Sequence, residues 1–335
     1  MRKGIICAGN WIIDQVKTID RYPAEGESCH ILYEEKSGGG GPCNILCDLA
    51  AMQIDLPLYA AGRVGDDDDG QWLIEEMKKR NIDTRKLLKT SGVPTSSSDV
   101  LSGGGKRTFL IRDGANSHLN RQDFDGVLPE VKIFYLGYLL LLERLDAADP
   151  QYGTAASGLL SDMQKRGFIT VVDFVAVEPS RYAVEIPSAM QYTDILVINE
   201  LEAGYTTNCL TRSAGGQLDF EALHHAANCF FDWGVRRSVV FHYPEGAFVM
   251  DRGCKPERYR SFDIDPREIQ GTNGAGDAFC AGILYGIHQN LPWTETIAVA
   301  NASAWFNLRH HTASGGAASI KEIYRKINDE KLGKF

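Results

Sequence analysis

Six short runs of apolar, mostly β-branched residues recur along this chain, and most of them end at turn residues. The runs are 5–8, 58–64, 133–137, 169–173, 195–198 and 238–241. Stretches with the apolar spacing of a helix lie between them, at 72–80, 152–166 and 220–233. Apolar runs without polar alternation are typical of strands buried on both faces, and strands that alternate with helices form βαβ units. The order therefore predicts an open α/β sheet of mainly parallel strands.

Two segments interrupt this rhythm, at 11–36 and 94–112, where polar and apolar residues alternate without a helical period. They predict a small antiparallel sheet beside the main one, which we call the lid, with the glycines at 103–105 as a hairpin tip. The chain from residue 274 onward has mostly helical spacing. We therefore expect one domain over residues 1–335 that carries a lid.

Composition narrows the classes of partner. The formal net charge is −9 and the pI is near 5.4, so no basic surface is expected for nucleic acid, and a small metabolite fits better. Eight cysteines occur without a CxxC pair or zinc spacing, which favours reduced thiols. Neither a signal peptide nor a membrane-spanning run is apparent, so no membrane partner and a cytoplasmic location are expected.

The most informative segment is Gly271-Thr-Asn-Gly-Ala-Gly-Asp277, a glycine-rich turn that leads into an apolar helical face. The backbone N–H groups of Gly274, Ala275 and Gly276 would be unpaired at the helix start, where the helix dipole also favours negative charge. The segment therefore predicts an anion site. Asp277 is either the general base that takes the proton of an acceptor hydroxyl, or a first-turn acid that only interacts favourably with the helix dipole.

Other well-known motifs are missing from the sequence. It contains no GxxxxGK[ST] phosphate loop, no GxSxG nucleophile elbow and no HExxH zinc motif. Phe279 stands where the last small residue of GxGxxG would be, so the dinucleotide interpretation fails as well. The anion site therefore belongs to none of these classes.

The 271–277 segment resembles the DTxGAGD signature of the ribokinase-like (phosphofructokinase B type) carbohydrate kinase family. Other segments agree with the family in the same order, over about residues 4–320. They are Gly39 to Asn44, like GGxxxN; Gly62 to Asp67 with Gly70, like GxVGxDxxG; Gly114 to Asn116 with Leu119, like GANxxL; and Asn199 with Glu202, like NxxE.

The resemblance implies a three-layer α/β/α fold with a β lid, and an ATP-dependent kinase that phosphorylates a small sugar or polyol. Asp277 would be the base, and the Gly274 to Gly276 amides would stabilise the transferring phosphoryl group. The expected substrate contacts are Asn10, Asp14, Gly39, Gly40, Asn44, Arg107, Phe109 and Tyr138. The expected nucleotide contacts are Asn199, Glu202, Gly246, Thr272 and Asn301, with Glu202 also acting on Mg²⁺ through water.

Simpler interpretations remain for some of these residues. Asn199 to Glu202 also has the pattern of a helix N-cap followed by acidic first-turn residues. Asp14 and Arg107 are also compatible with a solvated strand face.

The sequence departs from the family at two places. Gly271 replaces the aspartate that begins the signature and that binds a monovalent cation in several members, so potassium activation is in doubt. The segment 241–246 keeps only Gly246 of a stretch that usually touches ATP, which leaves nucleotide preference open.

Three further points stay open. Tyr33, Phe109 and Tyr138 would stack on a nucleobase as readily as on a sugar, which allows a nucleoside kinase. A catalytically silent sugar-binding or regulatory protein is a second alternative. The lid is also a candidate interface for a homodimer.

Overall fold

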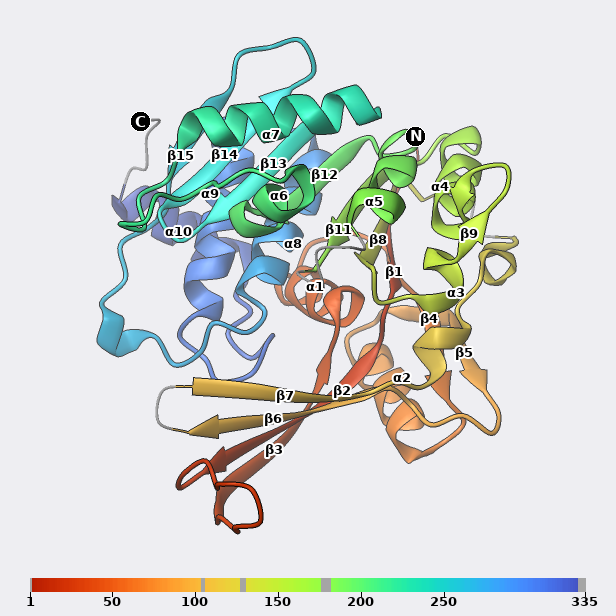
Figure 1. Ribbon diagram of the computed structural model, residues 1–335, viewed down its shortest axis with the longest axis vertical. Helices are drawn as coiled ribbons and strands as arrows, with labels where there is room; N and C mark the ends of the chain where they lie inside the picture. The colour runs from red at the N-terminus through yellow and green to blue at the C-terminus, as the bar shows by residue number, and fades with distance from the viewer. Residues whose placement is uncertain (1, 104–105, 127–130, 176–181, 331–335) are drawn as a thin grey trace.

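The computed structural model describes residues 2–103, 106–126, 131–175 and 182–330, with the side chains of 106–107 and 182–184 excepted. Within this part of the chain, nine strands form one large sheet (Figure 1). Across the sheet they are β15 (Glu257–Arg260), β14 (Gly246–Asp251), β13 (Ser238–Tyr243), β12 (Ile195–Asn199), β11 (Ile169–Phe174), β8 (Ile133–Leu139), β1 (Ile5–Gly9), β4 (Leu58–Gly65) and β5 (Asp83–Thr90). The strands from β13 to β5 pair in parallel, and β14 and β15 add an antiparallel edge.

The six predicted strands are all present, and three further strands of this sheet were missed. β14 and β15 continue from β13 as an antiparallel meander, and β5 closes the opposite edge with a sequence rich in charged residues. An edge strand has one solvated side, so β5 and β15 lack the continuous apolar run by which the inner strands were recognised, whereas β14 has such a buried run and was overlooked.

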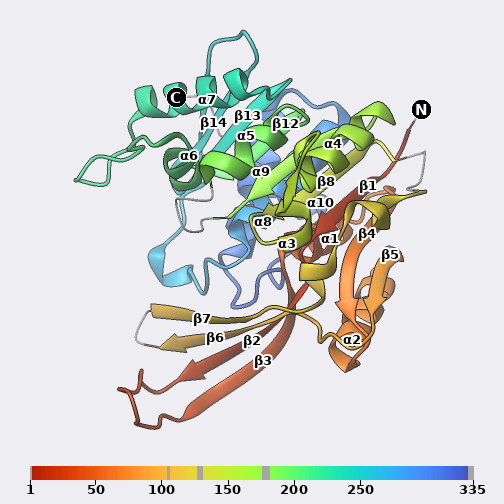
Figure 2. The same ribbon diagram turned by 45° about the vertical axis from the view of Figure 1, so that its right-hand side comes forward.

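Helices cover both faces of the large sheet, as Figures 1 and 2 show. One face packs against α1 (Gly41–Ala51), α2 (Asp68–Lys79), α8 (Ala275–Gln289), α9 (Trp293–Asn307) and α10 (Ile320–Glu330). The other packs against α3 (Glu143–Asp146), α4 (Ala155–Lys165), α5 (Tyr182–Met190), α6 (Glu200–Thr207) and α7 (Phe220–Trp233). Alternate residues of β1 point into the two cores, Ile5 into one and Ile6 into the other. The predicted three-layer α/β/α architecture is confirmed. None of the helices in the described residues is long and apolar enough to cross a membrane.

A second sheet extends from the base of the first, most clearly in Figure 2. It contains β3 (Ile31–Gly39), β2 (Ile12–Ile19), β6 (Ser97–Gly103) and β7 (Lys106–Arg112), in that order. These strands come from the two segments predicted for the lid. The expected antiparallel pairing was wrong in one respect, because β2 and β6 pair in parallel. β2 pairs with β3 in one hairpin and β6 pairs with β7 in another. The two hairpins lie side by side, with the first strand of each running in the same direction. Residues 104–105 of the predicted tip lie outside the described residues.

Trp11 joins the two sheets, since β1 ends at Gly9 and β2 begins at Ile12. Its side chain is fully buried, and the indole Nε1 donates to the Ala61 carbonyl at 2.9 Å. The buried Asn116 accepts from the Trp11 N–H and donates to the Trp11 carbonyl, both at 2.9 Å. The base of the lid is therefore fixed to the large sheet through the Ala61 carbonyl and the Asn116 side chain.

Candidate active site

Three side chains meet at the carboxyl edge of the large sheet. Asp277 lies in the first turn of α8 and is almost fully buried. The Tyr138 hydroxyl, near the end of β8, donates to Asp277 Oδ1 at 2.5 Å, and Asn44 Nδ2 of α1 donates to Oδ2 at 2.8 Å. One donor on each oxygen fixes the carboxylate plane. The three residues are far apart in the sequence, so only the complete fold brings them together.

Burial raises the pKa of Asp277 to about 6, while the hydrogen bonds from Tyr138 and Asn44 work in the opposite direction. The carboxyl is therefore mostly ionised at neutral pH and still close to its pKa. This is the range in which a general base operates efficiently.

Asp14 of β2 brings a second carboxylate to this region from the lid. Burial and then the charge of Asp277 raise the pKa of Asp14 to about 7, against a hydrogen bond with Asn273. Ser37 and Ser98 lie directly opposite Asp14 on the neighbouring strands, and their buried hydroxyls have no hydrogen-bond partner among the described residues. Residues opposite one another share a face of a sheet. The lid thus presents one acid flanked by two hydroxyls, of which sequence reasoning had identified only Asp14.

The glycines before α1 permit close contacts. A Cβ on Gly39 would lie 2.3 Å from Asp14 Oδ2. Gly40 is the N-cap of α1 with φ of 85°, and a Cβ there would lie 2.2 Å from the Asn10 carbonyl oxygen. Asn10 in turn accepts from the Tyr138 N–H at 3.1 Å through Oδ1. These packing demands explain why glycine occupies both positions.

Asn44 keeps one unused acceptor beside the base. Its Nδ2 is bonded to Asp277, but its buried Oδ1 has no partner in the part of the chain that the structure describes. A buried amide oxygen left without a donor is costly, so this atom points to a hydroxyl or N–H donor from a ligand. An acceptor sugar or polyol supplies such donors.

The predicted anion site is formed by the first turn of α8. Gly274 is left-handed, with φ of 77°, and a Cβ there would lie 2.1 Å from the Ala313 carbonyl oxygen. The N–H of Ala275 contacts the carbonyl of the exposed Thr272 at 3.5 Å, a weak bond, while those of Gly276 and Asp277 have no helical carbonyl four residues before them. The small residues leave room for the phosphates of a nucleotide, so the turn fits ATP.

Asn199 and Glu202 form a reciprocal cap at the start of α6. Asn199 Oδ1 accepts from the Glu202 N–H at 2.8 Å, and Glu202 Oε2 accepts from the Asn199 N–H at 2.9 Å. This is the N-cap that the sequence offered as the simpler explanation.

Asp173 lies at the end of β11. Burial raises its pKa, and the charges of the nearby Glu202 and Asp277 raise it further. The Tyr135 hydroxyl donates to Asp173 at 3.3 Å. Sequence reasoning missed Asp173, although a polar residue ending a buried parallel strand is a usable signal. No group of three metal-ligating side chains occurs among the described residues. The acids therefore fit a Mg²⁺ that is held largely by nucleotide phosphates and water.

The remaining candidates have structural roles or lie elsewhere. A Cβ on Gly246 would lie 1.9 Å from the Tyr259 carbonyl oxygen, so the pairing of β14 with β15 requires glycine there. The buried Asn301 donates to the Arg260 carbonyl at 2.8 Å. Phe109 is exposed on β7, and the Arg107 side chain lies outside the described residues. Ligand contacts by these four residues stay predictions.

A cavity of about 680 Å³ lies where the lid meets the large sheet. Its lining includes Asn10, Ile12 and Asn116 near the lid base, and Leu140 and Asp146 after β8. Asn10 on its wall accepts from the Tyr138 N–H, but Asp277, Asn44 and Asp14 do not line this cavity. The space is sufficient for a small metabolite.

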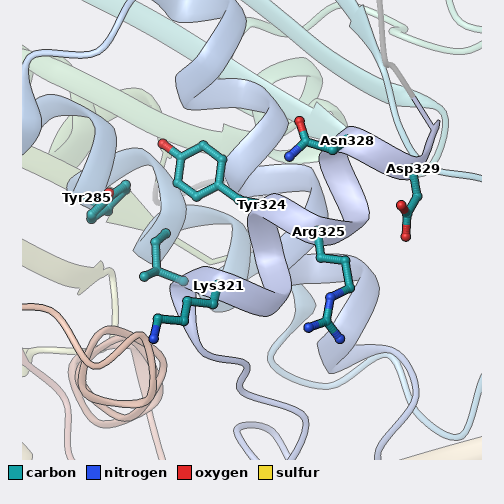
Figure 3. A pocket seen from close by; sticks show the side chains of 7 residues that line it. Tyr285, Lys321, Tyr324, Arg325, Asn328 and Asp329 are labelled. Atoms are coloured by element: carbon teal, nitrogen blue, oxygen red, sulfur yellow. The ribbon is translucent and has the colours of Figure 1, made fainter.

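A second cavity, of about 550 Å³, lies along α10 and lacks comparable chemistry. Figure 3 shows that Lys321, Arg325 and Asp329 point in separate directions along the helix. Tyr324 is engaged with Glu295 through a 2.6 Å hydrogen bond. The Asp277 region is therefore the better candidate.

Comparison with known proteins identifies the family. The model of the pfkB family carbohydrate kinases matches residues 2–319. The chain belongs to the pfkB family. The resemblance drawn from the 271–277 segment is thereby confirmed, and the protein is a carbohydrate kinase.

Relatives of this pfkB protein have several names. It is 21% identical to a ribokinase of Staphylococcus aureus, covering 96% of this chain and 99% of the relative. It is 26% identical to an adenosine kinase of Schizophyllum commune, with coverage of 84% and 87%. Among solved structures, Arabidopsis thaliana ribokinase complexed with ribose and ATP superposes with a TM-score of 0.81 at 21% identity, over 97% of this chain and 98% of the other. These matches establish the ribokinase fold.

Proposed function

We propose that the protein transfers the γ-phosphate of ATP to a hydroxyl of a small sugar or polyol, with Asp277 as the general base. The observation that carries the proposal is the Asp277 carboxylate, fixed by Tyr138 and Asn44 at the first turn of α8. An alcohol held there lies between a base and an anion site, which is the arrangement that phosphoryl transfer needs.

The acceptor would be oriented by the unused Asn44 Oδ1, by Asp14 and by Asn10, with Gly39 and Gly40 allowing close approach. Carboxylate and amide oxygens accept hydrogen bonds from hydroxyls, so this set suits a polyhydroxylated ligand. Arg107, Phe109 and Tyr138 are proposed as further acceptor contacts.

In the reaction, the acceptor O–H proton passes to Asp277 as the acceptor oxygen forms a bond to the γ-phosphorus. The bond from that phosphorus to the β,γ-bridging oxygen breaks, and ADP leaves. The free N–H groups at Gly276 and Asp277 stabilise the charge on the equatorial oxygens. Water must be excluded, because it competes as a nucleophile, and closure of the lid over the acceptor would do this.

Mg²⁺ would neutralise charge on the phosphates, and Glu202 and the neighbouring Asp173 are proposed to orient its water ligands. Asn199, Gly246, Thr272 and Asn301 are proposed on the nucleotide side. Gly271 contributes no carboxylate, so activity is expected without added potassium.

Asp277→Asn tests the proposal. With Mg·ATP and a panel of sugars and polyols, the variant should lose about 10²- to 10⁴-fold in kcat, as expected for removal of a general base, with little change in ATP affinity. Asp55→Asn, at an exposed carboxylate in the loop after α1, is the control and should retain full activity. Near-normal turnover by Asp277→Asn would remove the base assignment.

A nucleoside acceptor is the second candidate. The similarity to an adenosine kinase and the exposed aromatic rings of Tyr33 and Phe109 on the lid favour it, since aromatic rings stack on nucleobases. A parallel panel of nucleosides decides between the two, because the true acceptor class should show the higher kcat/KM.

The lid is proposed as a homodimer interface. Six large apolar side chains are exposed on its outer strands β3 and β7: Ile31, Leu32, Tyr33, Phe109, Leu110 and Ile111. Exposed apolar side chains on edge strands are typical of association sites, and a second copy would present the same edges about a two-fold axis. Light scattering should give twice the chain mass, and replacement of Leu32 and Ile111 by Ser should give a monomer.

The eight cysteines are all free in the structure. Free thiols are typical of proteins in reducing compartments, so we propose a cytoplasmic location.

A further inference from the structure

His242 lies at the end of β13, next to the proposed phosphate site. It pairs with Asn199 of β12 on one side and with Ala247 of β14 on the other, so it belongs to the same sheet edge as Asn199. The imidazole packs against the first turn of α8. A Cβ on Gly276 would lie 3.1 Å from His242 Cε1 and 3.4 Å from Nε2.

The ring is held without a polar partner. It lies 5.1 Å from the Phe279 ring, one turn further along α8, and it makes no hydrogen bond with any described residue. The surrounding elements carry two titratable groups in their first turns, Asp277 on α8 and Glu202 on α6, while β14 places Ala247 opposite His242.

Burial alone lowers the pKa of His242 to about 4, without a contribution from either acid. The ring is therefore neutral without ligand at neutral pH. A neutral imidazole still has one N–H donor and one ring nitrogen that can take up a proton.

We propose that His242 is a nucleotide-phosphate contact that takes up a proton when the polyphosphate binds. This inference rests on the proposed function, because it needs phosphates at the first turn of α8. A phosphate oxygen that accepts from the Gly276 N–H lies about 3 Å from that nitrogen. The imidazole flanks the same residue, so the bound charge and the ring are close neighbours.

The size of the effect follows from the charge. One phosphate charge about 5 Å away, at an effective dielectric constant of about 20, raises the pKa of His242 by roughly 2 units, to about 6. A pKa that rises on binding strengthens binding as the pH falls through the raised value. Affinity should then be about tenfold higher at pH 5 than at pH 8, and about half a proton should be taken up per nucleotide at pH 6.

Titration calorimetry with Mg²⁺ and the non-hydrolysable analogue AMP-PNP tests this in three buffers of different ionisation enthalpy. The slope of the heat against that enthalpy counts the protons taken up. Asp277 and the nucleotide itself also titrate near pH 6, so the readout is the difference between the wild type and His242→Gln, which removes only the imidazole. The expected difference is about half a proton at pH 6 and close to none at pH 8.

The two proposals fail in distinguishable ways. Equal proton uptake and equal pH dependence of affinity in wild type and His242→Gln would overturn the role of His242 and leave the kinase intact. No binding of nucleotide by the wild type would overturn both.

A second measurement does not depend on the variant folding. The chain has eight histidines, and ¹⁵N spectra of the wild type at pH 6 should show one imidazole changing from neutral toward charged when AMP-PNP is added. If all the histidine signals keep their charge state, the inference is wrong. His242→Thr provides a second variant for the calorimetry.

Discussion

The buried carboxyl of Asp14 should destabilise the protein at high pH, and its replacement by Asn should relieve this. Burial, followed by the charge of Asp277, raises the pKa of Asp14 from 3.8 to about 7. The native state therefore holds the Asp14 proton more tightly than the unfolded chain does. The contribution of Asp14 to stability is therefore fully present below its unfolded pKa near 4 and is lost as the pH rises toward and through 7.

The magnitude follows from the difference between these two pKa values. At 1.36 kcal/mol per unit, complete ionisation of Asp14 costs about 4 kcal/mol of folding free energy. Between pH 5 and pH 8.5 the cost should grow by ~2 to 3 kcal/mol, because part of it is already present at pH 5. With an unfolding entropy of about 2.1 cal/mol/K per residue, this corresponds to roughly 3 to 4 °C in Tm.

Thermal and urea unfolding of wild type and Asp14→Asn across this pH range provides the assay. The gap between the two stability curves should widen in favour of the variant as the pH rises, and Asp55→Asn, at an exposed carboxylate, should follow the wild type. Parallel curves, or a wild type that gains on the variant at high pH, would refute the reasoning. Because Asp14 is a proposed acceptor contact, the more stable variant should also be the poorer enzyme.

Three further outcomes are expected at the site. Tyr138→Phe removes a donor that lowers the pKa of Asp277, so the acid limb of the kcat/KM profile, near pH 6 in the wild type, should move up by about one unit, with activity recovering at pH 8. Gly276→Ala places a methyl group 3.1 Å from the His242 ring and should raise the KM for ATP about tenfold, or about 1.4 kcal/mol, while Tm is unchanged or slightly higher. Glu202→Gln retains the cap on α6, so its Tm should equal that of the wild type. Its half-maximal rate should require several-fold more Mg²⁺. If the Mg²⁺ dependence is unchanged, Glu202 acts only as a cap.

The inner strands could be predicted from the sequence because burial on both faces leaves a continuous apolar signature. The same reasoning missed β5, whose edge position permits Asp83, Arg85 and Lys89. It also gave the lid the wrong pairing, since nothing in a strand's own residues shows whether its neighbour runs parallel or antiparallel.

At the site, the sequence identified Asp277, Asn44 and Tyr138 as candidates but not the hydrogen bonds between them. Those contacts join positions more than 130 residues apart, and no local spacing encodes them. Ser37 and Ser98 were missed for a related reason. Each is an ordinary strand residue until pairing places it opposite Asp14.

The fixed position of Trp11 limits how the lid can move. A hinge at the two residues between β1 and β2 would need its backbone to rotate freely, yet Asn116 bonds both backbone groups of Trp11 and the indole is fully buried. Any swing over the acceptor must therefore come from bending and twisting of the strands further out, where Ile31 and Tyr33 of β3 face solvent. The outer half of the lid is then the compliant part, so a partner bound to that surface would alter the ease of closure as well as the state of assembly.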